Sequence, residues 1–247
     1  MNIAIAGYGY VGQAYYALLK DHFSITVVDP AVNSNKITDE EGVIICVATP
    51  QGSNGECDIS NVLDVISQTN ENSPILIKST ISLEGWRKIN QQFPWHRITF
   101  SPEFLRAKTA VEDVFETTRM MFGAGDIGFW RSVFAKAYSA FFVDVADPEA
   151  LILAKYFRNA YLATRVSFFN QVFDLCQAEG INYDTVRIAI GSDPRIGFSH
   201  SAVTQDRGFG GHCFPKDTSA IVSTAKQSGV DLSIIKTAIE YNNRVRE

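Results

Sequence analysis

The stretch Gly7-Tyr8-Gly9-Tyr10-Val11-Gly12 decides the fold class of this chain. It follows an apolar run at residues 2–6, which predicts a buried strand, and it precedes an apolar helical segment at residues 14–19. An acidic residue, Asp29, ends the next predicted strand about twenty residues further on. A lone GxGxxG is weak, but this order of strand, glycine turn, helix and acid indicates a dinucleotide-binding Rossmann unit rather than a purely structural turn.

The alternation of strands and helices continues through the first part of the chain. Continuously apolar runs such as IAIA, GVIICV and PILI predict parallel strands that are buried on both faces. Helical segments follow Asp58 and Ser82, whose side chains suit N-cap positions. The strands are expected at residues 2–6, 24–29, 42–47, 74–78, 97–100, 119–122 and 141–145. We therefore predict a doubly wound, mostly parallel α/β sheet, with an NAD-binding Rossmann domain over residues 1–146.

A long helix is predicted to begin at Asp147-Pro148-Glu149. Aspartate can cap a helix, proline fits its first turn, and glutamate suits the positive end of its dipole. The helix runs to about residue 179 and is apolar around most of its circumference, so it must be covered on several sides. We expect an all-α second domain over residues 147–247, built on this helix, and a homodimer packed through it.

The composition excludes several classes of partner. The chain has 247 residues, a net charge of −5 and no basic excess, which disfavours nucleic acid and anionic membranes as partners. No apolar run reaches the ~18–20 residues of a membrane span, and the N-terminus lacks the basic region of a secretory signal. The four cysteines are far apart, without disulfide spacing. We expect a cytoplasmic protein without a metal site.

The segment GFGGHCFPKD at residues 208–217 carries the strongest chemical signal of the second half. Pro215 suits the first turn of a following helix, which leaves Cys213 beside the positive helix N-terminus and close to Lys216. This placement should favour the thiolate and predicts a nucleophile. The alternative is a structural cysteine, although such residues more often sit inside apolar runs, as Cys46 and Cys176 do.

Further candidates are ambiguous when each is taken alone. Lys155 and Asn159 share a face of the long helix, and the lysine either has a function or extends its amine to water. Glu103 follows a strand end within SPEFLR and is either a cleft residue or a helix cap. The turns after two other strands, which contain Thr49, Pro50 and Thr80, suit either a ligand at the edge of the sheet or simple capping.

Together, these residues resemble the UDP-glucose dehydrogenase family, within the UDP-glucose/GDP-mannose dehydrogenase superfamily. The similar segments occur in the family's order over essentially the whole chain: AIAGYGYVG, VATPQG followed by CDIS, IKSTI, SPEFLR, KYFRNAYLATRVSFFNQ, SDPRIG and GFGGHCFPKD.

The resemblance implies NAD as the cofactor and a cysteine-dependent oxidation of a nucleotide sugar. Cys213 would capture the aldehyde, and Lys155 and Asn159 would steady the oxyanion and the water. Asp217 would support proton transfer, and Glu103 would serve in thioester hydrolysis. Thr80 would lie against the nicotinamide. The implied cofactor-binding residues are Gly7, Gly9, Tyr10, Val11, Gly12, Asp29, Thr49, Pro50, Thr80 and Lys216. The implied substrate-binding residues are Phe104, Leu105, Arg106, Lys155, Asn159, Arg195, Phe209 and Gly210, and Arg195 would reach the sugar site of a partner subunit.

The implied reaction converts UDP-glucose to UDP-glucuronate, with GDP-mannose as an alternative substrate. It needs two hydride transfers, and a thiolate retains the aldehyde between them as a thiohemiacetal that is oxidised to a thioester. Asp29 favours NAD over NADP because its carboxylate repels a 2′-phosphate. Two other functions stay open: a two-electron hydroxyacid dehydrogenase, and a non-catalytic NAD-binding dimer derived from the family.

The chain departs from the family in two places. Ala107 stands where the family's motif carries a second glutamate that contacts the cofactor, which puts the placement of the nicotinamide in question. The family's chains also continue into another α/β domain that holds the nucleotide, whereas this sequence ends at Glu247. We expect NAD binding to persist and turnover of the sugar to be weak or absent unless another chain supplies that domain.

Overall fold

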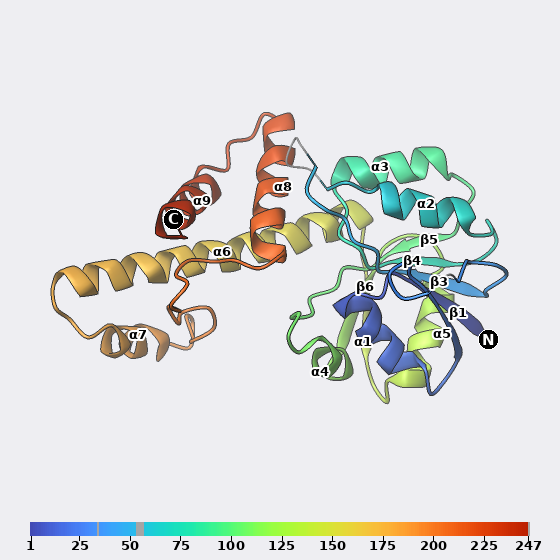
Figure 1. Ribbon diagram of the computed structural model, residues 1–247, viewed down its shortest axis with the longest axis horizontal. Helices are drawn as coiled ribbons and strands as arrows, with labels where there is room; N and C mark the ends of the chain where they lie inside the picture. Colours follow the sequence, from blue (N-terminus) through green and yellow to red (C-terminus); the bar gives the residue numbers. More distant parts are fainter. Residues whose placement is uncertain (34, 53–56, 247) are drawn as a thin grey trace. The chain divides into compact units, whose positions relative to one another are not determined.

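The structure is a computed structural model that describes residues 1–33, 35–52 and 57–246. It forms two compact units, one of residues 1–52 and 57–155 and one that begins at residue 156. The division falls inside the long helix α6 (Pro148–Ala178), which Figure 1 shows with the other elements. The predicted boundary after residue 146 stays a prediction, and Glu247, the predicted end of the second domain, lies outside the described residues.

A five-stranded parallel sheet forms the centre of the first unit. Its strands lie in the order β2-β1-β3-β4-β5, and each neighbouring pair is parallel. The residues of β1, β3 and β4 are almost completely buried, as their apolar runs predict. The strands are β1 (Asn2–Ala6), β2 (Ser24–Val28), β3 (Gly42–Ile45), β4 (Ile75–Ile77) and β5 (Ile98–Phe100).

Two further strands, β6 (Arg119–Phe122) and β7 (Phe142–Val145), pair with each other in parallel as a separate small sheet. They are linked to the main sheet by an isolated antiparallel bridge between Phe100 and Gly123. Pairing stops there because the chain turns away at Ala124 and Gly125, which both have positive φ values. The sequence predicts both strands but does not reveal this break in the sheet.

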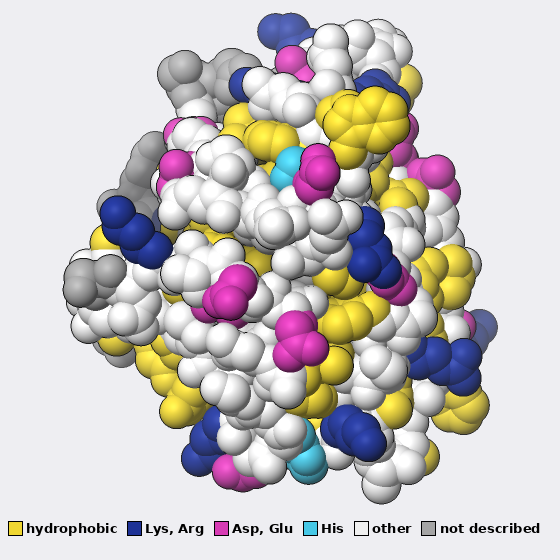
Figure 2. All heavy atoms as spheres, turned by 90° about the vertical axis from the view of Figure 1, so that its right-hand side faces the viewer, with side chains coloured by type: hydrophobic (Ala, Val, Ile, Leu, Met, Phe, Trp, Pro, Cys, Tyr) yellow, Lys and Arg dark blue, Asp and Glu magenta, His cyan; other side chains and the backbone are white. Residues whose placement is uncertain are grey.

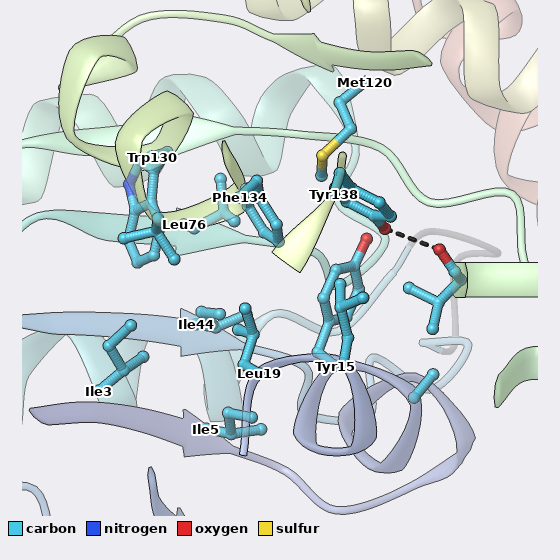
Figure 3. Packing of buried hydrophobic residues seen from close by; sticks show 14 of the residues in the cluster. Ile3, Ile5, Tyr15, Leu19, Ile44, Leu76, Met120, Trp130, Phe134 and Tyr138 are labelled. Carbon is cyan, nitrogen blue, oxygen red and sulfur yellow. Dashed lines mark hydrogen bonds between the residues drawn. The ribbon is translucent and has the colours of Figure 1, made fainter. Parts of the chain in front are cut away.

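Helices cover both faces of the main sheet, which makes the fold doubly wound (Figure 1). One face is covered by α1 (Tyr10–Leu19) and α5 (Ile127–Ala137), and the other by α2 (Ser60–Gln68) and α3 (Leu83–Gln92). Figure 3 shows the core beneath α1 and α5, where Tyr138 donates a hydrogen bond of 2.7 Å to the carbonyl of Val114 in α4 (Ala110–Phe115).

Two of the three predicted helix caps lie where expected. The hydroxyl of Ser82 accepts the amide of Gly85, and Asp147 accepts the amide of Glu149 at 2.8 Å, at the start of α6. The third prediction was wrong by one residue: α2 begins at Ser60, so Ile59 occupies the cap position. Asp58 nevertheless accepts the amide of Ser60 at 2.9 Å, because its side chain reaches over the intervening residue.

The regular elements that the structure describes from residue 156 onward are all helical. They are the remainder of α6, α7 (Tyr183–Gly191), α8 (Cys213–Gln227) and α9 (Ser233–Arg246). Ser167 of α6 donates to the carbonyl of Ala238 in α9 at 3.0 Å, and Asp174 of α6 binds Arg207 and the hydroxyl of Tyr241. These contacts join α6 to α9 and to the segment before α8.

Charged side chains of both signs are interspersed on the face drawn in Figure 2. Within the described ranges, none of the helices combines the length and hydropathy needed to cross a bilayer. The same residues contain no group of three or more His, Cys, Asp or Glu side chains arranged to bind a metal ion.

Candidate active site

The glycine turn between β1 and α1 is built for close backbone packing. Gly7 has a φ of +90°, and a Cβ added there would lie 2.6 Å from the backbone of Cys46 and Val47. A Cβ added at Gly12 would lie 2.0 Å from the carbonyl oxygen of Gly7. At Gly9, by contrast, an added Cβ meets nothing within 4 Å, so the turn is open on that side.

This turn lies at the switch point of the sheet. β1 leads into α1 on one face, and β3 leads toward α2 on the other, so the crevice of a doubly wound fold falls between the ends of β1 and β3. Thr49, which is buried, and Pro50, which is exposed, follow β3 at the same edge. Asp29, just after β2, accepts the amides of Tyr8 at 2.6 Å and Ala31 at 2.8 Å.

These features fit a bound dinucleotide. The open side at Gly9 and the positive N-terminus of α1 suit a pyrophosphate. Each carboxylate oxygen of Asp29 has a second lone pair that can accept a ribose hydroxyl. Tyr10 and Val11, the first residues of α1, are half-buried beside the turn.

Glu103 and Lys155 form a buried ion pair in the first unit. The ammonium of Lys155 lies 2.7 Å from Oε1 of Glu103, and the two side chains are only 5% and 7% exposed. Burial alone would raise the pKa of Glu103, but the charge and hydrogen bond of Lys155 outweigh it and lower the pKa. Lys155 therefore does not extend to water, and Glu103 caps no helix because α4 begins only at Ala110.

Lys78, at the end of β4, was missed by the sequence analysis as a candidate residue. Its side chain is buried, and its ammonium donates to the hydroxyl of Ser101 at 2.7 Å. Burial lowers the pKa of Lys78 from 10.5 to about 7. The available signal was a lysine directly after the fully apolar run PILI, within the segment IKSTI.

In the second unit, Asn159 binds Asp217. The amide Nδ2 of Asn159 donates to Oδ2 of Asp217 at 2.6 Å, and the ammonium of Lys216 lies 3.0 Å from Oδ1. Asp217 is almost fully buried in the second turn of α8. Lys155 and Asn159 are four residues apart on α6, so two polar residues on one face of this helix each bind a carboxylate.

Cys213 is the first residue of α8 and is half-buried, with Pro215 in the same first turn. The predicted position beside a helix N-terminus is confirmed. The preceding loop is held by two asparagines that the sequence analysis missed: Asn170 accepts the amide of Gly208 at 3.0 Å, and Asn242 accepts that of Phe209 at 2.6 Å. Both asparagine side chains are buried, so they fix the loop at Gly208 and Phe209, a few residues before the cysteine.

The remaining predicted residues lie in varied surroundings. Thr80 is half-buried just after β4, and Phe104 and Leu105 are half-buried after Glu103. Arg106 is exposed and binds Asp113, which helps to lower the pKa of that carboxyl. Arg195 is 87% exposed and is bound by Asp193, while Phe209 is buried with its ring against Phe214.

Comparison with known families matches two consecutive parts of the chain. Residues 31–141 match the NAD binding domain of the UDP-glucose/GDP-mannose dehydrogenase family, and residues 150–244 match the central domain of that family. The UDP-glucose 6-dehydrogenase of Rickettsia felis is 32% identical over 226 residues, which are 86% of this chain and 50% of that protein. The enzyme of the same name from Pseudomonas aeruginosa is 30% identical over 233 residues, which are 85% of this chain and 50% of that protein. The chain thus spans about half the length of the curated relatives it matches.

Solved structures share the fold. A UDP-glucose dehydrogenase from the archaeon Pyrobaculum islandicum superposes with a TM-score of 0.82 at 24% identity, over 98% of this chain and 68% of that one. A 3-hydroxyisobutyrate dehydrogenase from Mycobacterium tuberculosis gives a TM-score of 0.74 at 17% identity, over 100% of this chain and 94% of the other. These likenesses show the architecture alone. Because its first part matches the family's NAD binding domain and its second part the family's central domain, the chain belongs to the UDP-glucose/GDP-mannose dehydrogenase family.

Proposed function

We propose that the chain oxidises the primary alcohol of a nucleotide sugar to the acid, with UDP-glucose as substrate, NAD as oxidant and Cys213 as nucleophile. The observation that carries this proposal is the position of Cys213 at the first residue of α8, one turn before Asp217, whose carboxylate binds Asn159. Reactive cysteines are common at helix N-termini. The side chain of Cys213 is half-buried at this position.

NAD would be held at the switch point of the sheet. Gly9 and the first turn of α1 would receive the pyrophosphate, and Asp29 would accept the adenosine ribose hydroxyls. Thr49, Pro50, Thr80 and Lys216 are proposed contacts of the same cofactor, as implied by the family. When bound, NAD accepts the hydride in each of the two oxidations.

Different residues of the chain would act in successive steps of the reaction. The thiolate of Cys213 would add to the aldehyde carbon, and the alkoxide that develops would be stabilised by donors from Lys155 and Asn159. After the second oxidation, water would cleave the thioester with assistance from Glu103. Asp217 is hydrogen-bonded to Asn159 at 2.6 Å and would orient that amide.

A two-electron hydroxyacid dehydrogenase is the second candidate. The observation that favours it is the likeness to the 3-hydroxyisobutyrate dehydrogenase of M. tuberculosis, which extends over 94% of that chain. That reaction needs no thiol nucleophile, so it leaves Cys213 without a role.

The number of NADH molecules released per sugar distinguishes these functions. The purified chain, alone and with the family's C-terminal domain supplied as a separate chain, is incubated with NAD and limiting UDP-glucose, or with limiting GDP-mannose, and NADH and the sugar products are quantified. We expect two NADH per UDP-glucuronate formed. One NADH per sugar would support a two-electron enzyme, and NAD binding without any NADH would support a non-catalytic NAD-binding protein.

We also propose a homodimer that packs through α6. Four large apolar side chains on this helix are 43–64% exposed: Phe157, Tyr161, Phe168 and Leu175. Their spacings of four, seven and seven residues place them in one stripe along the helix, as in a helix–helix seam. A dimer would cover this stripe, and Arg195 would then be available to a site of the partner subunit.

Light scattering on the chain at micromolar concentration is expected to give twice the monomer mass. The double variant Y161E/F168E is expected to give the monomer mass, because it places two charges in the seam. A monomer from the unmodified chain would contradict the dimer. Replacing Trp95, which is 80% exposed outside α6, by glutamate is the matched control and should leave the dimer unchanged.

A further inference from the structure

Lys78 is a buried cation whose position the proposed mechanism does not use. It is 2% exposed, and its ammonium donates to Ser101 and lies 4.9 Å from the centre of the Tyr15 ring and 6.0 Å from that of Phe134. Figure 3 shows these two rings in the core, where they pack edge to face. Among the residues that the structure describes, no carboxylate forms a direct ion pair with it.

The groups around Lys78 leave one nearby negative charge. The titratable groups that influence it are Cys46 after β3, Glu103 after β5 and Lys155 on α6, and Tyr15 on α1 packs against it. Burial raises the pKa of Cys46 to about 12 and also raises the pKa of Tyr15, so both are neutral near pH 7. Among the described residues of this cluster, Glu103 is therefore the only anion, and Lys155 is its direct partner.

Lys78 is connected to Glu103 through a short, rigid path. Ser101 is fully buried, and its amide donates to the carbonyl of Ile77 at 3.0 Å, next to Lys78 in the chain. The hydroxyl of Ser101 accepts the ammonium of Lys78, and Glu103 follows two residues later. The ammonium thus holds the turn from which Glu103 projects.

In the proposed mechanism, the ammonium of Lys155 has two negatively charged partners. Its ammonium neutralises Glu103 at 2.7 Å, yet it would also donate to an oxyanion of the substrate. When it turns to that oxygen, Glu103 becomes a buried anion without its direct cation, which is a costly state. A second cation close to Glu103 reduces that cost.

We propose that Lys78 is a positioning residue that serves as the reserve counter-ion of Glu103 whenever Lys155 engages another anion. The cluster of Lys78, Glu103 and Lys155 has a net charge of zero when Lys78 is neutral and of +1 when it is protonated. A protonated Lys78 therefore already supplies a positive charge for the carboxylate when Lys155 turns to another anion. The catalytic use of this device rests on the proposed function, but the electrostatic coupling between Lys78 and Glu103 does not.

The coupling is tested by titrating lysine signals in the full chain without cofactor or sugar. With ¹³C-labelled lysine, NMR is expected to show one signal that titrates near neutral pH, that is absent in Lys78→Met and that persists in Lys88→Met, which removes an exposed lysine. In Lys155→Met, where Glu103 has lost its direct partner, we expect the Lys78 titration to move upward by more than one pH unit.

The upward shift in K155M has two possible causes, pairing of Lys78 with Glu103 and loss of the repulsion by Lys155, and a further variant distinguishes them. In the double variant E103Q/K155M the repulsion is gone as well, but no anion is left to pair with Lys78. We expect most of the upward shift to disappear there. A shift of equal size in both variants, or no shift in K155M, would overturn the proposal. Failure of catalysis would leave this result intact, because no substrate takes part.

Discussion

Replacing Cys213 by alanine is expected to abolish formation of the acid. In the proposed mechanism, the aldehyde would have no covalent attachment without the thiolate, so neither the thiohemiacetal nor the thioester would form. Removal of a nucleophile that acts in a catalytic unit costs at least about 10⁴-fold in turnover. The rate of acid formation from UDP-glucose, measured by chromatography, is expected to fall by that factor. NAD binding should persist, since the glycine turn lies in the first unit.

Cys176→Ala is the matched control for this prediction. It removes the same atom from the same unit, but Cys176 is a buried cysteine inside α6. We expect this variant to keep its acid production, with at most a modest loss of stability. If the C213A and C176A variants released acid at similar rates, the covalent mechanism would be wrong.

Replacing Lys155 by methionine is expected to destabilise the first unit strongly. Removing one partner of a buried ion pair leaves the other charge uncompensated and costs about 3–5 kcal/mol of stability. We expect the lower end of this range because Lys78 remains close to Glu103 and itself contributes to lowering the pKa of that carboxyl. The free energy of unfolding is measured by chemical denaturation.

The loss of stability in K155M is expected to depend on pH, in a direction set by the pKa of Glu103. In the unmodified chain the pKa of Glu103 is lowered below 4.5, so the pair stabilises the fold above that pH and loses its effect as the pH falls through the lowered value. In the variant the pKa of Glu103 rises relative to the unmodified chain, because burial remains and the main cation is gone. The loss of stability is therefore expected to be largest near neutral pH and to shrink in acid, as Glu103 becomes protonated.

Arg87→Met is the control for K155M, because it breaks another ion pair between a cation and a glutamate of the first unit. Arg87 binds Glu149 of α6 at 2.7 Å, but its side chain is 63% exposed. Such an exposed pair contributes about 0–1 kcal/mol, and water can replace the lost partner. An equal loss of stability in both variants would mean that the Glu103–Lys155 pair does not act as a buried pair.

The central sheet and the long helix were predictable from the sequence because their signals are local. The apolar runs of β1, β3 and β4 match strands that are buried on both faces, and Asp147-Pro148 marks the start of α6 to within a residue. The separation of β6 and β7 was not predictable, because it depends on a turn at Ala124 and Gly125 that breaks the pairing with β5. Apolar character predicts a strand but not its partner.

The candidate site was predictable only in part, for a similar reason. The glycine turn and the helix N-terminus at Cys213 are set by residues that are neighbours in the chain. Lys78, Asn170 and Asn242 acquire their roles from partners that are distant in sequence, such as Ser101 and the amides of Gly208 and Phe209. A single sequence does not show which buried polar residues meet.

The account rests on Cys213 carrying the sugar as a thioester. The most direct measurement is the mass of the Cys213 peptide after the Glu103→Gln chain has been mixed with UDP-glucose and NAD and then quenched in acid, since this variant is expected to hydrolyse the thioester slowly. We predict that this peptide gains the mass of the oxidised, sulfur-linked nucleotide sugar and that the C213A/E103Q chain shows no such adduct. Release of NADH while Cys213 stays unmodified would contradict the account.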